Sequence, residues 1–233
     1  MTANRLHPAV PPNERDRPLR LAVLISGSGS NLQALIDASQ RGDAPFEVGL
    51  VISNRADALG LERAARAGIP TQTLSHRGFE TRAGYDAALA ELLSEAAPGL
   101  IALAGFMRIL TPGFVEHWQG RMLNIHPSLL PSYRGLHTHQ RVLAAGDPVH
   151  GATVHFVTAE LDGGPAILQA RVPVLADDDP DRLAARVLKQ EHHIYPLATR
   201  WFAEGRLALS SDGRTQLDGK PLDSPVIITA DTA

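Results

Sequence analysis

The stretch 121–137 contains polar side chains whose types and spacing fit a site of chemistry. Residues 122–126 read Met-Leu-Asn-Ile-His, which predicts the end of a buried strand. Asn124 and His126 are two residues apart, so both side chains point to the same face of that strand. Pro127 ends the strand because it cannot donate a hydrogen bond to a neighbouring strand. The amide of Asn124 and the imidazole of His126 therefore lie at the carboxyl end of the strand, where open α/β sheets bind ligands. A polar pair satisfied by backbone groups is the alternative, and we favour it less because both side chains would need buried partners.

Asp162 offers a carboxylate that could complete such a site. It precedes Gly163 and Gly164 in the turn-rich loop 158–165, which could fold over the strand end that bears His126. A carboxylate beside an imidazole favours the charged imidazolium, and histidine changes its charge near neutral pH. Contact between Asp162 and His126 is therefore a hypothesis. The residues alone slightly favour the plainer interpretation, in which Asp162 only shapes the turn.

A second candidate site lies near the amino terminus. Residues 21–25 form a continuous apolar run, the mark of a strand buried on both faces, and Ser-Gly-Ser-Gly-Ser follows at 26–30. Helical spacing begins at Asn31, and a strand, a glycine-rich turn and a helix start together make an anion site. The sequence is neither a GxGxxG fingerprint nor a Walker motif, so dinucleotide and ATP binding are not supported. We favour phosphate binding over the alternative, a tight turn in which Ser30 or Asn31 caps the helix.

Short apolar runs alternate with amphipathic segments along the chain, which predicts strands that alternate with helices. This spacing implies one α/β domain with a mostly parallel, twisted sheet of about seven strands flanked by helices. The short loop between the last two strands favours a hairpin and therefore an antiparallel carboxy-terminal part. In the helix at 79–96 we expect Ala, Leu and Tyr85 on one face and the acidic residues opposite. The expected strands are 21–25, 48–52, 71–74, 100–104, 122–126, 151–157 and 166–174, and the expected helices are 58–67, 79–96, 114–118, 137–145 and 180–203, with a further helix starting at 31.

The apolar segment 105–110 follows the strand at 100–104 and contains Arg108. At a strand's carboxyl end such a loop could line a pocket for a flat aromatic ligand. Loop residues that only cover the core are an equally good interpretation on these grounds.

Composition bounds the function class. The chain has 233 residues, of which 44% are hydrophobic and 20% charged, as in an ordinary globular protein, and its formal net charge of -3 gives no case for a nucleic-acid surface. The absence of cysteine excludes disulfides and thiolate metal sites, and no apolar run has membrane-spanning length. We expect a cytoplasmic enzyme with a disordered extension at 1–19, a catalytic domain at 20–209 and a tail at 210–233 that includes a small hairpin.

Ten histidines raise the question of a metal site. His137 and His139 would seed one, but on a helix they point to different sides, and no HExxH spacing occurs. We therefore expect no bound metal. His155, in the middle of a predicted strand, is interpreted as a satisfied core residue rather than a catalyst.

Several of these segments together resemble a known family. They are Leu-Ile-Ser-Gly-Ser-Gly-Ser-Asn-Leu at 24–32, Ala-Gly-Phe-Met-Arg-Ile-Leu at 104–110, Asn-Ile-His-Pro-Ser-Leu-Leu-Pro at 124–131, Gly-Leu-His-Thr-His at 135–139, Val-His-Phe-Val at 154–157 and Leu-Asp-Gly-Gly at 161–164. The pattern resembles the formyltransferases, and within them the folate-dependent branch that formylates phosphoribosylglycinamide in purine synthesis. The resemblance runs from about residue 21 to about residue 207 and implies a Rossmann-like formyltransferase fold.

By this resemblance a substrate amine attacks the formyl carbon of 10-formyltetrahydrofolate, and Asn124, His126 and Asp162 are the catalytic residues. Asn124 and His126 would stabilise the tetrahedral oxyanion, and Asp162 would hold His126 charged and oriented, so the resemblance favours a catalytic Asp162 over a turn residue. The resemblance also assigns binding residues: Gly29, Ser30, Asn31, Glu191 and His137 for the ribonucleotide, and Arg82, Met107, Arg108, Ile109, Leu110, Asn124, Thr158 and Leu161 for the folate. An exposed arginine at a helix start is the alternative for Arg82.

Three other functions compete with this one. A methionyl-tRNA formyltransferase would carry a further RNA-binding domain and a basic surface, whereas a formyltetrahydrofolate hydrolase would use water in place of the amine. A non-catalytic folate- or nucleotide-binding module is the third, and the presence of Asn124, His126 and Asp162 together opposes it. We expect small-molecule substrates, no nucleic acid, no membrane, and a monomer or a homodimer.

Overall fold

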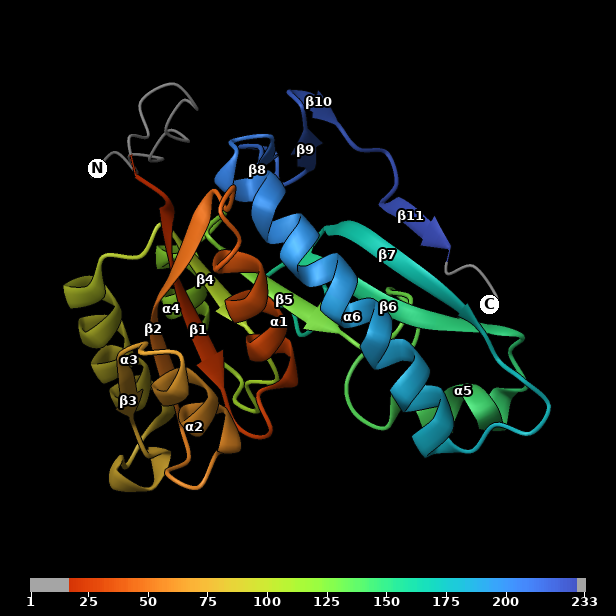
Figure 1. Ribbon diagram of the computed structural model, residues 1–233, viewed down its shortest axis with the longest axis horizontal. Helices are drawn as coiled ribbons and strands as arrows, with labels where there is room; N and C mark the ends of the chain where they lie inside the picture. The colour runs from red at the N-terminus through yellow and green to blue at the C-terminus, as the bar shows by residue number, and fades with distance from the viewer. Residues whose placement is uncertain (1–16, 230–233) are drawn as a thin grey trace.

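The computed structural model describes residues 17–229, and most of the predicted extension at 1–19 lies outside them. The main sheet has eight strands in the order β11-β7-β6-β5-β4-β1-β2-β3 (Figure 1). Its strands are β1 (Leu19–Ile25), β2 (Phe46–Ser53), β3 (Thr71–Thr73), β4 (Leu100–Leu103), β5 (Met122–His126), β6 (Val149–Phe156), β7 (Ala166–Pro173) and β11 (Val226–Thr229). Strands β1 to β5 are all parallel, whereas β6 runs antiparallel to β5 and to β7. The predicted α/β fold, mostly parallel sheet and antiparallel carboxy-terminal part are confirmed.

Helices cover both faces of the sheet (Figure 1). They are α1 (Ser30–Ser39), α2 (Leu59–Arg66), α3 (Arg82–Ala96), α4 (Pro112–His117), α5 (Thr138–Ala145) and α6 (Pro180–Ala203), with a short 3-10 helix η2 (His76–Gly78). The apolar residues of β1 show why both faces are needed. Leu21, Val23 and Ile25 pack with α1, α2 and α6, whereas Ala22 and Leu24 pack with α3 and α4. Because successive side chains of a strand point to opposite faces, a continuous apolar run requires a helical layer on each side.

Helix α3 differs from the sequence expectation in two ways. It begins at Arg82 rather than at 79, because the Thr81 side chain accepts a hydrogen bond from Gly84 N at 3.0 Å and caps the helix. Asp86 is buried and accepts from Thr111 N at 2.6 Å, so this acidic residue does not lie on the exposed face. The Thr111 amide, which lies between β4 and α4, supplies a partner for one oxygen of this buried carboxylate.

The carboxy-terminal residues add more to the sheet than the sequence predicts. A small antiparallel sheet of β8 (Leu207–Leu209), β9 (Thr215–Leu217) and β10 (Lys220–Pro221) contains the expected hairpin. Strand β11 then pairs in parallel with β7 and becomes the eighth strand of the main sheet. The main sheet therefore extends beyond the predicted boundary at 209, because β7 would otherwise present an unpaired edge.

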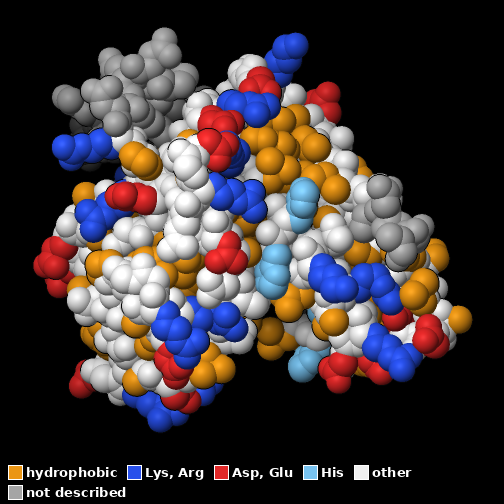
Figure 2. Space-filling model, viewed as in Figure 1, with side chains coloured by type: hydrophobic (Ala, Val, Ile, Leu, Met, Phe, Trp, Pro, Cys, Tyr) orange, Lys and Arg blue, Asp and Glu red, His pale blue; other side chains and the backbone are white. Residues whose placement is uncertain are grey.

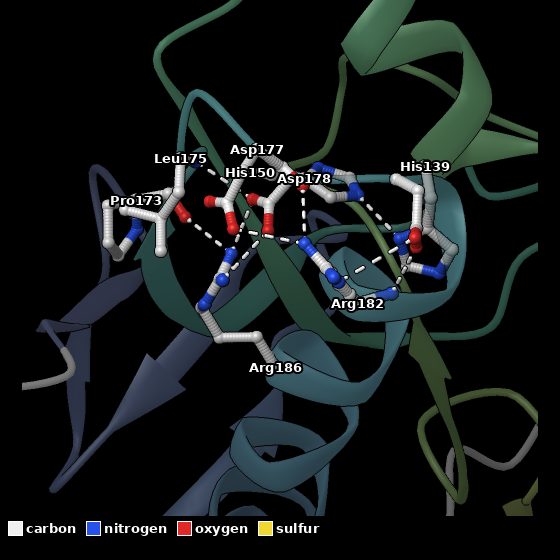
Figure 3. A network of polar contacts seen from close by, with 9 residues as sticks. His139, His150, Pro173, Leu175, Asp177, Asp178, Arg182 and Arg186 are labelled. Atoms are coloured by element: carbon white, nitrogen blue, oxygen red, sulfur yellow. Dashed lines mark hydrogen bonds and ion pairs between the residues drawn. The ribbon is translucent and has the colours of Figure 1, made fainter.

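Helix α6, the long blue helix in Figure 1, crosses one face of the sheet. Polar contacts fix its start (Figure 3). Arg186 donates to both carboxylate oxygens of Asp178, at 2.6 and 2.8 Å, and this guanidinium lowers the pKa of the Asp178 carboxyl. Asp178 also accepts from Leu175 N at 2.8 Å, and Asp179 caps the helix by accepting from Arg182 N. Within residues 17–229 no helix is both long and apolar enough to cross a bilayer.

Candidate active site

Strand β5 carries the predicted pair and lies between β4 and β6. Asn124 is level with Leu103 of β4 on one side and with His155 of β6 on the other. His126 is the last residue of β5, as expected for a group at the carboxyl edge of a parallel sheet. The structure therefore places both side chains where strand periodicity predicts them.

Both ring nitrogens of the buried His126 face oxygen atoms. Nε2 lies 3.1 Å from the carbonyl oxygen of Tyr133, which can only accept, so this nitrogen carries a proton. Nδ1 lies 3.5 Å from Oδ2 of Asp162, with both side chains 8% exposed. Each ring nitrogen of His126 therefore has an oxygen acceptor close to it.

Asp162 joins two loops rather than only shaping one. Its Oδ2 accepts a hydrogen bond from Gly135 N at 2.8 Å and also faces His126. An ion pair between Arg134 and Glu160 fastens the same two loops at the surface. The expected proximity of Asp162 and His126 is confirmed, whereas the catalytic role of Asp162 stays a prediction.

Gly164 allows the Asp162 loop to lie close to β6. A Cβ atom built on Gly164 would lie 1.8 Å from the carbonyl oxygen of Phe156, the last residue of β6. A side chain there would displace the backbone, because real Cβ atoms do not approach so closely. The second glycine of the Asp-Gly-Gly motif is thus a packing requirement.

His155 orients Asn124. Its Nδ1 lies 2.8 Å from the Phe156 carbonyl oxygen and must donate, so Nε2 is left as an acceptor for Asn124 Nδ2 at 3.1 Å. Burial lowers the pKa of His155 to about 4, so the ring is neutral at pH 7. The prediction of a satisfied core residue is confirmed, but the sequence interpretation missed that its partner is the candidate catalytic amide.

Buried side chains from β6 and β7 hold the segment that follows His126. Thr153 Oγ1 donates to Ser128 O at 2.6 Å and accepts from Leu130 N at 3.0 Å. Gln169 Nε2 donates to Leu130 O at 2.7 Å. These contacts tie the Pro-Ser-Leu-Leu-Pro segment to the sheet and so determine where Tyr133 meets His126.

The glycine-rich turn after β1 leads directly into α1. Gly29 occupies the N-cap position with φ of 69°, and the helix has no side-chain cap. The alternative interpretation, in which Ser30 or Asn31 caps the helix, is therefore wrong. Asn31 instead donates from Nδ2 to Glu191 Oε2 at 2.6 Å, and both side chains are buried. Burial raises the pKa of Glu191, and the hydrogen bond from Asn31 opposes that rise.

A cavity of about 540 Å³ lies beside this turn, at the carboxyl ends of β1 and β4. Strand β1 lies between β2 and β4, so the strand that follows β1 lies on one side of it and β4 lies on the other. The carboxyl ends of β1 and β4 are therefore a topological switch point of the sheet. Ser26 Oγ accepts from Met107 N at 2.8 Å and joins the two loops. The cavity is lined by Ser26, Gly27, Ser28, Gly29, Ser30, Asn31, Asn54, Arg55, His76, Ala104, Gly105, Met107 and Arg108.

The remaining predicted residues differ in their exposure. Met107, Ile109 and Leu161 are exposed apolar side chains, at 68%, 55% and 54%, whereas Leu110 is buried. The Arg108 guanidinium lies over the Tyr85 ring, 5.5 Å from its centre. Thr158 is half-buried, and Arg82 and His137 are exposed at the starts of α3 and α5.

The structure does not bring every predicted residue into the cavity. Asn124, His126, Asp162 and Arg82 are absent from its lining. Conversely, Asn54, Arg55 and His76 line it and were not predicted. Their position just after the second and third predicted strands was the available signal, because parallel strands end at one edge of the sheet.

A second cavity, of about 310 Å³, lies on the α1 side of the turn and is lined by Ser30, Gln33, Ala34, Asp37, Arg41, Arg63 and His192. In the space-filling view of this face, histidine side chains lie along α6 and basic side chains lie over α2 (Figure 2). His139 and His150 contact each other, Nδ1 to Nε2, at 3.0 Å (Figure 3). In the described part of the chain no group of three or more His, Cys, Asp or Glu residues could hold a metal ion.

Comparison with known proteins identifies the family. A family model described as formyl transferase matches residues 19–199, and the chain belongs to this family. Its relatives include the phosphoribosylglycinamide formyltransferase of Escherichia coli (strain K12), which is 56% identical over 204 residues that cover 88% of this chain and 96% of that protein. The enzyme of the same name from Haemophilus influenzae is 51% identical and covers 87% of this chain. The solved structure of phosphoribosylglycinamide formyltransferase from Coxiella burnetii superposes with a TM-score of 0.86 at 51% identity, over 90% of this chain and all of that chain.

Proposed function

We propose that this protein transfers the formyl group of 10-formyltetrahydrofolate to the amine of 5-phosphoribosylglycinamide, a step of de novo purine biosynthesis. Relatives with this name match nearly the whole described chain, which supports the reaction class. The observation that carries the proposal is the placement of His126 between Asp162 and the Tyr133 carbonyl, with Asn124 beside it on β5.

The chemistry is a nucleophilic addition followed by an elimination. The amine lone pair forms a bond to the formyl carbon, and the carbonyl π electrons move to its oxygen, which becomes an oxyanion. The attacking nitrogen then loses a proton, and N10 of the folate gains one. Collapse of the intermediate re-forms the carbonyl and breaks the bond from carbon to N10, which leaves tetrahydrofolate and the formylated amide.

Asn124 and His126 stabilise the oxyanion. One N–H of the Asn124 amide is bonded to His155, which leaves the other N–H free to donate to the oxyanion. The Nε2–H of His126 is bonded to the neutral Tyr133 carbonyl. A charged oxygen competes well for that proton, because charge-assisted hydrogen bonds are roughly twice as strong as neutral ones. Donors that are already oriented when charge develops supply the largest part of such catalysis.

Asp162 acts through His126. Its carboxylate faces Nδ1, so a proton on that nitrogen has a charged partner. The hydrogen bond from Gly135 N keeps the carboxylate in place. Asp162 therefore keeps the imidazole correctly rotated, and it also lies where a water that relays the proton could be held.

The ribonucleotide occupies the turn before α1. Backbone N–H groups of Gly29, Ser30 and Asn31 hold its phosphate, assisted by the helix dipole. The Glu191 carboxylate, bonded to Asn31, accepts hydrogen bonds from the ribose hydroxyls, and His137 lies near the same substrate. This places the phosphate end of the substrate in the cavity beside β1.

The folate occupies the loops after β4 and β6. Exposed apolar side chains from both loops, Met107, Ile109 and Leu161, contact its flat rings, as apolar walls do in most small-molecule sites. Arg108 and Arg82 supply positive charge for its carboxylates, and Leu110, Asn124 and Thr158 complete the walls.

The decisive experiment measures loss of 10-formyltetrahydrofolate with and without glycinamide ribonucleotide. We expect consumption only when the ribonucleotide is present, and a loss of about 10²–10³ in kcat for His126→Ala, as for removal of an oxyanion donor. His117→Ala is the matched control, because His117 is exposed on α4 and its ring packs edge-on against Trp118. Fast consumption in water alone would indicate a formyltetrahydrofolate hydrolase instead. Folded protein without turnover in either condition would refute an enzymatic function.

A further inference from the structure

Helix α2 contacts the turn 26–30 through two hydrogen bonds to its carbonyl groups. Gly60 N donates to Gly27 O at 3.1 Å, and Arg63 Nε donates to Ser28 O at 2.9 Å. Gly60 and Arg63 are one helical turn apart, so both face the loop. Two consecutive carbonyl groups of the loop are thus held from behind by a single helix.

These two bonds determine where the loop's own donors point. A trans peptide is planar, and its C=O and N–H groups point in opposite directions. With Gly27 O turned toward α2, the N–H of Ser28 points away from it, and with Ser28 O turned toward Arg63, the N–H of Gly29 does the same. Within residues 17–229 neither of these N–H groups has an acceptor. Both residues line the cavity of about 540 Å³, so α2 presents two free donors to that cavity.

The contact between the turn and α2 leaves no room for a side chain at Gly29 or Gly60. A Cβ atom on Gly29 would lie 2.5 Å from Gly60 Cα, and one on Gly60 would lie 2.5 Å from Ile25 Cδ1 and 3.2 Å from Gly29 Cα. The two backbones therefore touch directly. A methyl group at Gly60 must displace the end of the buried Ile25 side chain and press on the backbone of the turn at Gly29.

Arg63 contributes charge as well as a hydrogen bond. Its guanidinium bonds to the Ser28 carbonyl and reaches Gln33 of α1 at 3.4 Å. A cation on a carbonyl oxygen polarises that peptide and makes its N–H, here that of Gly29, a stronger donor. The positive charge of Arg63, held against the turn by these contacts, also attracts an anion toward it.

We propose that Gly60 and Arg63 are positioning residues for the ribonucleotide phosphate, which they hold indirectly by turning the N–H groups of Ser28 and Gly29 into the site. This inference rests on the proposed function, which assigns the phosphate to the N–H groups of 29–31, and it adds the N–H of Ser28 to that set. It adds α2, an element without any predicted site residue, to the substrate-binding machinery.

Steady-state kinetics test the inference with matched variants. Arg63→Met removes the donor and the charge but keeps the aliphatic stem. Arg66→Met, three residues further along the same helix, removes an exposed ion pair with Glu62. Gly60→Ala adds a methyl group against the loop, whereas Gly113→Ala on α4 adds one in open space. We expect KM for glycinamide ribonucleotide to rise about tenfold or more in Arg63→Met and Gly60→Ala, the factor that about 1.4 kcal/mol represents. In Arg63→Met and Gly60→Ala, kcat and KM for 10-formyltetrahydrofolate should change by less than about twofold. In the two control variants, all three constants should stay within the same limit.

Amide NMR separates this inference from the function on which it rests. Wild-type protein is titrated with glycinamide ribonucleotide while the N–H resonances of Ser28 and Gly29 are followed. Wild-type shifts at these residues together with a raised Kd in Arg63→Met support the inference. Wild-type shifts with the same Kd and KM in a folded Arg63→Met protein overturn the inference alone. Ribonucleotide binding that leaves the 28–31 amides unshifted overturns the phosphate subsite and the inference together. An equal rise in KM for both substrates would indicate general structural damage and count against positioning.

Discussion

Asn124 Nδ2 donates to His155 Nε2 over 3.1 Å across the β5–β6 pair. The opposite ring nitrogen of His155 donates to the Phe156 carbonyl, so the tautomer is fixed by a backbone group that cannot change. A neutral histidine thus serves as the acceptor that sets the direction of the candidate catalytic amide. Burial lowers the pKa of His155 to about 4, so the ring is neutral at pH 7 and its Nε2 can accept from Asn124.

His155 substitutions should therefore change turnover through Asn124. His155→Leu leaves the amide without an acceptor, whereas His155→Gln supplies a side-chain oxygen that can accept. We expect kcat to fall about 10–100-fold in His155→Leu, below the 10²–10³ that removal of an oxyanion donor costs, and by less in His155→Gln. Both KM values should change little. Equal kcat in the two variants, at equal melting temperature, would contradict a positioning role.

The contact between His139 and His150 predicts a pH dependence of stability. Burial lowers the pKa of His150 from 6.5 to about 4, with His139 and His126 acting in the same direction and Asp147 opposing them, and burial also lowers the pKa of His139. Between about pH 6.5 and 4 the unfolded chain then binds more protons than the folded one, so the free energy of unfolding falls as the pH falls. The limiting slope is about 1.4 kcal/mol per pH unit for each proton.

Denaturant unfolding between pH 4.5 and 7.5 measures this slope. His150→Gln, which can still hydrogen-bond His139, should reduce the slope by up to one proton in this range. His193→Gln is the control, because His193 is exposed on α6. An unchanged slope in His150→Gln would show that His150 is not the group that takes up the proton.

The two glycines after Asp162 should respond differently to a methyl group. At Gly164 a Cβ atom meets the Phe156 carbonyl oxygen, a backbone atom that cannot yield. At Gly163 it meets only the end of the Glu160 side chain, which can rotate away. We expect Gly164→Ala to lower stability by about 1–3 kcal/mol and to lower kcat, because the loop that carries Asp162 is displaced. Gly163→Ala should lose much less of both, as thermal unfolding and steady-state rates would reveal.

Residue periodicity predicted the fold well because most elements are locally determined. The apolar runs of β1 and β4, the stop signals of α2 and the short hairpin between β6 and β7 each follow from nearby sequence. The paired placement of Asn124 and His126 follows from strand geometry in the same way. Strand β11 was missed although its residues, Val-Ile-Ile-Thr, favour a strand, because its partner β7 lies more than fifty residues earlier in the chain.

Contacts between distant segments explain what was missing from the predicted site. Gly60 and Arg63 look like ordinary residues of an amphipathic helix, and their contact with the turn 26–30 depends on how α2 packs against α1. Asp86 looks like a surface acid until the Thr111 amide is brought to it. Such pairings are tertiary, so single-sequence patterns do not encode them.

Glu191→Gln should make the protein more stable and a poorer enzyme. Burial raises the pKa of Glu191 from 4.5, so above that pH the unfolded chain releases its proton before the folded chain does. The folded state then binds more protons, and the free energy of unfolding falls as the pH rises through this window. Glutamine carries no charge and removes that loss, while its amide oxygen can still accept from Asn31. We expect a gain of roughly 0.5–2 kcal/mol in the free energy of unfolding at pH 7, in the range of substitutions that relax a functional site.

KM of Glu191→Gln for the ribonucleotide should rise, because a neutral amide accepts more weakly from the ribose hydroxyls than a carboxylate does. Denaturant unfolding and steady-state kinetics on the same samples measure both effects. Lower stability in Glu191→Gln would mean that the ionised carboxylate is well compensated in its buried position, and it would remove the reason for expecting a trade-off between stability and substrate binding there.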